Sequence, residues 1–132
     1  MARRINHVGV AVKDLEETLA FFERMFDLKP IKEVRTPNMK AAFIRVGDGE
    51  IELLQPTDPQ APIAKFIEQK GEGLHHLSIQ VRKLDKVLRE LKKKGVKLID
   101  ERPRIGVHGV HIAFLNPEST MGLLIELCEE DR

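Results

Sequence analysis

Two histidines and two glutamates occupy matching places in two stretches of this sequence. His7 and His76 each open an alternation of apolar with small or polar residues, followed by a charged pair and a leucine. Glu52 follows His7 by 45 residues in Ile-Glu-Leu-Leu, and Glu126 follows His76 by 50 residues in Ile-Glu-Leu-Cys. Two imidazoles and two carboxylates suit a divalent ion such as Co²⁺, Ni²⁺, Zn²⁺ or Mn²⁺. Four protein ligands on an octahedral ion leave two positions, enough to chelate a substrate through two oxygens.

Each of these residues also has a purely structural explanation. A strand histidine is more often a satisfied structural residue than a ligand, and a glutamate between leucines can face solvent on a half-exposed sheet. His75 falls on the face of Leu77 by strand parity, so we interpret it as structural. His111 could line a cavity, but the structural interpretation is favoured. Cys128 has no cysteine partner and is interpreted as a packing residue.

The elements that must position these residues repeat as well. Period-two alternation predicts half-buried strands over residues 7–12 and 76–81. A helix follows each strand: Asp14 with Glu17 forms a capping box for the first, and the second runs from about residue 84 to 94 with Gly95 as its stop. Further strands are expected over residues 28–35, 40–46 and 50–55, and over 96–99, 110–115 and 122–128. Each half therefore reads β-α-β-β-β.

The expected fold class is α+β, with two βαβββ modules in one chain forming a curved mixed sheet around a metal cavity. Residues 1–132 form a single domain, with a first module over 1–56, a linker with a short amphipathic helix over 57–73, and a second module over 74–132. The prolines of the linker suit a turn rather than a helix interior. In this arrangement His7, Glu52, His76 and Glu126 would converge in one cavity.

Composition excludes several classes of protein. Lys+Arg is 22 against Asp+Glu 21, which argues against a nucleic-acid binder, and a single cysteine excludes a disulfide framework. No apolar run reaches the roughly 18 residues of a membrane span, and no secretory signal opens the chain, so we expect a soluble cytoplasmic protein with no membrane partner. A charged fraction of 33% with few Asn and Gln is typical of a thermophile.

Several segments resemble one family along nearly the whole chain. They are residues 5–12, 51–56, 62–66 (Pro-Ile-Ala-Lys-Phe), 73–77, 103–109 (with Gly-Val-His-Gly) and 114–127. The His-strand segments resemble the vicinal oxygen chelate, or glyoxalase-like, superfamily. The segments at 62–66 and 106–109 are similar to those of its methylmalonyl-CoA epimerases.

The resemblance implies an isomerase that interconverts the R and S epimers of methylmalonyl-CoA, and a homodimer. It implies His7, Glu52, His76 and Glu126 as ligands of a divalent metal, with Co²⁺ expected ahead of Ni²⁺, Zn²⁺ or Mn²⁺. Glu126 and Glu52 are the expected acid/base residues. Gly106, His108 and Gly109 form either a simple turn or a loop that closes on the substrate. Some family members carry a second catalytic glutamate on the strand matching residues 39–44, where this sequence has no acid.

Three alternatives stay open at this point. Glyoxalase I, a lactoylglutathione lyase, has a comparable His/Glu/His/Glu set but is disfavoured by the segments at 62–66 and 106–109. A metal-free binding protein of the same fold is disfavoured because the ligands are intact in both halves. An extradiol dioxygenase uses two histidines and one carboxylate on iron, and a fourth ligand would crowd its open positions.

Overall fold

The computed structural model describes residues 1–129 of the chain. Its strands are β1 (Ala2–Ala11), β2 (Pro30–Thr36), β3 (Met39–Val46), β4 (Gly49–Pro56), β5 (Gly73–Val81), β6 (Arg104–Ile105), β7 (His111–Phe114) and β8 (Ile125–Glu129). Its helices are α1 (Leu15–Phe26), α2 (Pro62–Lys70), α3 (Leu84–Lys93) and the 3₁₀ turn η1 (Pro117–Ser119). The chain divides into two compact units. The first unit comprises His7–His75, and the second comprises Met1–Asn6 with the residues from His76 onward.

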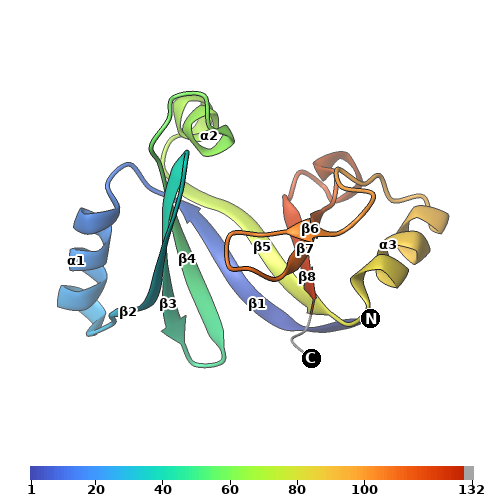
Figure 1. Cartoon of the computed structure of the whole chain (residues 1–132), viewed down its shortest axis with the longest axis horizontal. Coiled ribbons are helices and arrows are strands. Elements are labelled where there is room, and N and C mark those ends of the chain that lie inside the picture. The colour runs from blue at the N-terminus through green and yellow to red at the C-terminus, as the bar shows by residue number, and fades with distance from the viewer. Residues whose placement is uncertain (130–132) are drawn as a thin grey trace. The chain divides into compact units, whose positions relative to one another are not determined.

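The first unit contains a four-stranded mixed sheet in the order β2-β3-β4-β1. β1 and β4 run parallel, whereas β3 lies antiparallel to β4 and to β2. α1 covers one face of this sheet (Figure 1). Leu15 of α1 packs there with Ile44 and Leu53 in the hydrophobic core of the unit.

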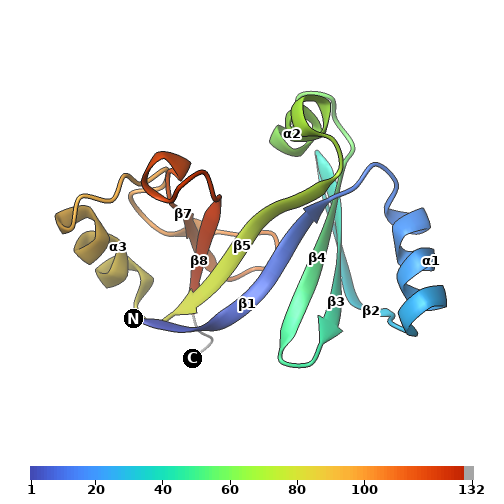
Figure 2. The ribbon, with the colours of Figure 1, turned by 180° about the vertical axis from the view of Figure 1, so that it is seen from behind.

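The sheet of the second unit has the order β5-β8-β7-β6, which is equivalent to the order β1-β4-β3-β2 of the first unit. β5 and β8 are parallel, and the pairs β7–β8 and β6–β7 are antiparallel. α3 lies beside β7 and β8 (Figure 2) and contributes Leu84, Val87 and Leu88 to a core with Leu127. The predicted βαβββ order and the α+β class are therefore confirmed in each unit.

Both βα helices donate a backbone N–H hydrogen bond at their start to a side chain on the last strand of their own unit. Asp14 caps α1 as predicted, accepting from the Glu17 N–H at 3.0 Å. The Leu15 N–H donates in addition to Gln55 Oε1 of β4 at 2.8 Å. In the second unit the Leu84 N–H donates to Glu129 Oε1 of β8 at 3.3 Å. Each helix is thus bonded to the strand that carries a candidate glutamate. In both strands the accepting side chain lies three residues after that glutamate.

The linker helix belongs to the first unit. α2 starts with Pro62 in its first turn, where a missing N–H costs nothing. Its Phe66 ring meets the His75 ring edge-on, with centroids 4.8 Å apart. Within the described part of the chain no helix is long and apolar enough to cross a bilayer.

One predicted strand of the second half is wrong, and another starts later than predicted. Residues 96–99 form only a single bridge, between Leu98 and Leu115. The Asp100 carboxylate accepts a hydrogen bond from the Phe114 N–H at 2.8 Å, which ends the pairing of this segment with β7. β6 pairs with β7 and is the edge strand instead. The strand expected over 122–128 begins only at Ile125. Gly122 sits at φ +87° in a turn closed from the Leu123 N–H to the Thr120 carbonyl, a geometry that a strand does not allow.

Candidate functional site

The first unit places His7 and Glu52 on one face of its sheet. His7 alternates with Gly9 along β1, and Gly9 is in register with Glu52 on the parallel strand β4, so the three positions share a face. His7 Nε2 lies 3.7 Å from Glu52 Oε1, and the two side chains are 1% and 5% exposed. The neighbouring Leu53 points to the other face, into the core under α1.

The second unit builds the same pair. Ser78, two residues after His76 on β5, is in register with Glu126 on β8. His76 Nε2 lies 4.0 Å from Glu126 Oε1, with side-chain exposures of 3% and 5%. The Phe114 ring of β7 stands edge-on to the His76 ring, with centroids 5.8 Å apart. Leu127 again points to the opposite face, into the core under α3.

Each pair is therefore a buried imidazole next to a buried carboxylate on the sheet face away from the helix. Both N–O distances exceed a hydrogen bond. A buried carboxylate is costly unless a positive charge or a metal compensates it. Two ligands of one ion lie roughly 3 Å apart when adjacent and about 4 Å apart when opposite, given metal–ligand lengths of about 2.0–2.2 Å. The donor types, burial and spacing of both pairs thus fit ligands of a divalent metal.

The segment with Gly106, His108 and Gly109 forms the hairpin loop between β6 and β7. The Gly106 N–H donates to the Val110 carbonyl at 2.8 Å, and the Gly109 N–H to the Gly106 carbonyl at 3.0 Å. A ring nitrogen of His108 lies within 4.8 Å of a Glu126 carboxylate oxygen. The loop thus brings a second imidazole to the candidate glutamate of this unit.

The remaining histidines lie elsewhere. His75 points to the other face of β5 from His76 and packs on Phe66. His111 shares its face with Ala113, which lies in the core under α3. Cys128 is 1% exposed, as its interpretation as a packing residue requires.

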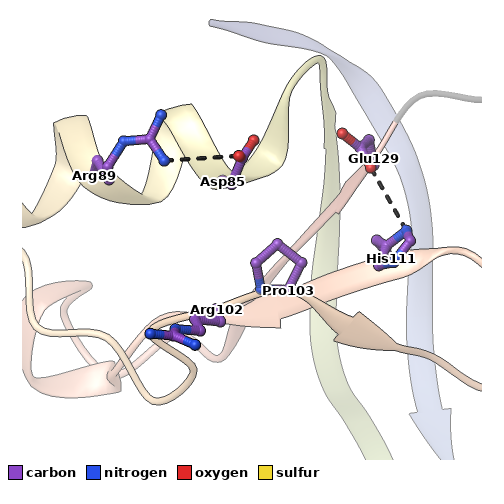
Figure 3. A pocket seen from close by; sticks show the side chains of 6 residues that line it. All are labelled: Asp85, Arg89, Arg102, Pro103, His111 and Glu129. Carbon is purple, nitrogen blue, oxygen red and sulfur yellow. Dashed lines mark ion pairs between the residues drawn. The ribbon is translucent and has the colours of Figure 1, made fainter.

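His111 belongs to an open cavity of about 540 Å³ on the helix side of the second unit. Figure 3 shows two ion pairs in its wall, Glu129 Oε2 with His111 Nδ1 at 3.7 Å and Asp85 with Arg89 at 3.6 Å. Glu129 also caps α3 there. These contacts agree with a structural interpretation of His111.

Sequence reasoning did not single out Ser78 as a site residue. Its side chain is fully buried on the same face as His76 and in register with Glu126. The signal was available in the strand parity, because Ser78 stands two residues after His76 as Gly9 stands two residues after His7.

Comparisons with known proteins agree with this geometry. Residues 6–114 match the Glyoxalase/Bleomycin resistance protein/Dioxygenase superfamily. The human mitochondrial methylmalonyl-CoA epimerase is 35% identical over 127 residues, covering 94% of this chain and 72% of that protein. The uncharacterized protein YqjC of Bacillus subtilis is 36% identical, covering 96% of this chain and 91% of that protein.

A solved structure of the same family superimposes over nearly the full length. A variant of the Streptomyces coelicolor methylmalonyl-CoA epimerase, in complex with 2-nitronate-propionyl-CoA, gives a TM-score of 0.92 at 27% identity. The match covers 98% of this chain and 96% of that one. The chain therefore belongs to the glyoxalase superfamily and, within it, to the methylmalonyl-CoA epimerase family of isomerases.

Proposed function

We propose that this protein interconverts the R and S epimers of methylmalonyl-CoA by removing and returning the proton on the α-carbon. The observation that carries the proposal is the buried His–Glu pair that both units build at equivalent register, His7 with Glu52 and His76 with Glu126. A solved structure of a methylmalonyl-CoA epimerase holding methylmalonyl-CoA, at 27% identity and a TM-score of 0.92, supports the choice of substrate.

We propose that the two pairs together hold one divalent metal ion, Co²⁺ ahead of Ni²⁺, Zn²⁺ or Mn²⁺. Two imidazoles and two carboxylates match the preferences of these ions. When bound, the ion supplies a Lewis acid for the thioester and carboxylate oxygens of the substrate. Two carboxylate ligands in the donor set would offset the charge of a divalent ion.

Glu52 and Glu126 are the proposed proton carriers. Epimerisation breaks the α C–H bond, moves that proton to one carboxylate, and returns a proton from a second group to the other face of the carbon. The two glutamates occupy equivalent places in the repeat, which suits one carrier for each face. A neighbouring cation would lower the pKa of a carboxylate and weaken it as a base, so a glutamate held by the ion would have to loosen from it before it accepts a proton. His108, in the hairpin loop next to Glu126, is proposed to close on the substrate with Gly106 and Gly109.

Incubation with each epimer of methylmalonyl-CoA in D₂O tests the reaction. Deuterium should appear at the α-carbon of both epimers together with net inversion, and chelator treatment should abolish both. Glu52→Gln keeps an oxygen ligand but removes one carrier. One epimer should still exchange its α-proton while inversion falls steeply, and Glu126→Gln should show the opposite preference.

A parallel assay with the hemithioacetal of glutathione and methylglyoxal provides the control. Turnover of that compound without exchange in methylmalonyl-CoA would contradict the proposal. Near wild-type inversion by Glu52→Gln would restrict Glu52 to a ligand and leave the second carrier to another group.

We further propose that the protein acts as a cytoplasmic homodimer and comes from a thermophile. The single, buried cysteine suits a reducing compartment, closed twofold dimers are the commonest oligomers, and the 33% charged residues suit high temperature. Light scattering coupled to gel filtration measures the mass in solution, and a chain mass of one subunit would refute the dimer.

A further inference from the structure

The Ser78 hydroxyl is a buried polar group that the proposed reaction does not yet use. Ser78 is 0% exposed in β5. Among residues 1–129, no atom forms a hydrogen bond with its Oγ. Buried hydroxyls without a partner are rare and costly in folded proteins, so this group requires an explanation.

Ser78 lies beside one of the two proposed metal-binding carboxylates. It is the register partner of Glu126 across β5 and β8, on the same sheet face. On the other side, the register partner of Glu126 is Phe114, whose ring cannot donate a hydrogen bond. Of the two register partners of Glu126, Ser78 is thus the one whose side chain can donate a hydrogen bond to this carboxylate.

The first unit has no hydroxyl at the equivalent position. Glu52 has Phe43 as its register partner on β3 and Gly9 as its register partner on β1. The aromatic neighbour is therefore repeated, whereas the serine is replaced by a residue with no side chain. The two glutamates match in strand, register and histidine partner. Their surroundings differ in this hydroxyl and in the ring of His108, which the loop of the second unit brings near Glu126.

We propose that Ser78 is a positioning residue that donates a hydrogen bond to the Glu126 carboxylate when the metal is bound, and so makes Glu126 the more firmly held of the two carboxylates. The inference rests on the proposed function. A donated hydrogen bond restricts the carboxylate to one orientation, as outer-shell partners of metal ligands do. Glu52, with Gly9 in place of the serine, lacks this particular restraint and turns away from the ion more readily.

Metal affinity of Ser78→Ala tests this directly. Titration of Co²⁺ against a chromophoric chelator should show affinity weakened by roughly tenfold to a hundredfold, the range found when outer-shell partners are lost. The visible absorption of bound Co²⁺ should change because the orientation of one ligand is released. Ser78→Gly, which reproduces the residue of the first unit, should give the same loss although it leaves more empty space.

Stability of the same variants separates positioning from packing. After chelator treatment, Ser78→Ala should unfold at the same temperature as the wild type or higher, because no described residue bonds to the hydroxyl it removes. A clear decrease in the unfolding temperature of Ser78→Ala would show a structural role and overturn the inference. A much larger loss of Co²⁺ affinity in Ser78→Gly than in Ser78→Ala would overturn it as well.

Proton exchange in D₂O gives a third readout. At saturating Co²⁺, Ser78→Ala should change the rate of exchange in the epimer whose proton Glu126 carries, identified with Glu126→Gln, by a larger factor than in the other epimer. Equal slowing of both epimers would indicate a general disturbance and contradict the inference. If the wild type binds none of Co²⁺, Ni²⁺, Zn²⁺ and Mn²⁺, the proposed metal site itself fails. If the wild type binds Co²⁺ and Ser78→Ala binds it equally well, only the role of Ser78 is refuted.

Discussion

The adjacent residues His75 and His76 should respond to substitution in opposite ways. His76→Ala removes a buried imidazole 4.0 Å from Glu126 and is expected to weaken Co²⁺ binding by more than the roughly 10- to 100-fold caused by loss of an outer-shell partner. His75→Ala should leave the affinity for Co²⁺ unchanged, since its ring packs on Phe66 from the other face of β5.

The melting temperature, in contrast, should fall in His75→Ala. An edge-on aromatic pair such as His75 with Phe66, at 4.8 Å, is worth about 1 kcal/mol. For a chain of 132 residues this corresponds to a decrease in Tm of about 3–5 °C for His75→Ala. Circular dichroism in the presence of chelator measures this decrease, and chelator competition measures the affinity for Co²⁺.

Two controls sharpen the comparison. His75→Phe keeps an aromatic ring on Phe66 and should recover most of the lost Tm. His111→Ala removes an exposed imidazole on the helix side and should preserve Co²⁺ binding. If His75→Ala releases the metal while His76→Ala retains it, the assignment of faces along β5 is wrong by one residue, and the proposed ligand set fails with it.

Three further outcomes follow from the contacts of the fold. Gln55→Ala leaves the Leu15 N–H without its side-chain acceptor and should destabilise the protein by about 1–3 kcal/mol in urea titrations, whereas the exposed Gln69→Ala should change little. Leu88→Ala empties part of the core under α3 and should cost about 2–5 kcal/mol by the same measurement. Lys97 lowers the pKa of Glu118 through a hydrogen bond and its charge, so their pair stabilises the fold above the ordinary pKa of glutamate and loses this effect as the pH falls through the lowered value. The Tm difference between Lys97→Met and wild type should therefore shrink on acidification.

Local patterns in the sequence were sufficient to predict most of the architecture. The βαβββ repeat follows from period-two alternation after His7 and His76 and from helical spacing after Asp14, and such patterns depend only on which face of an element is buried. The repeat also singled out His7, Glu52, His76 and Glu126 as matching positions, and the structure pairs one histidine with one glutamate in each unit.

Contacts between distant segments decided the rest. The edge strand of the second unit is β6 because the Asp100 carboxylate accepts a hydrogen bond from the Phe114 N–H. The spacing of apolar residues in the sequence does not show that a side chain competes with the backbone for this N–H. The Leu15 N–H of α1 donates to Gln55 and the Leu84 N–H of α3 donates to Glu129, acceptors that lie 40 and 45 residues away along the chain. The neighbour of Glu126 is Ser78 because of the register between β5 and β8, and register is set by the packing of whole strands. The sequence by itself determined which residue types face which side of each strand, and only the tertiary structure decided which of them meet.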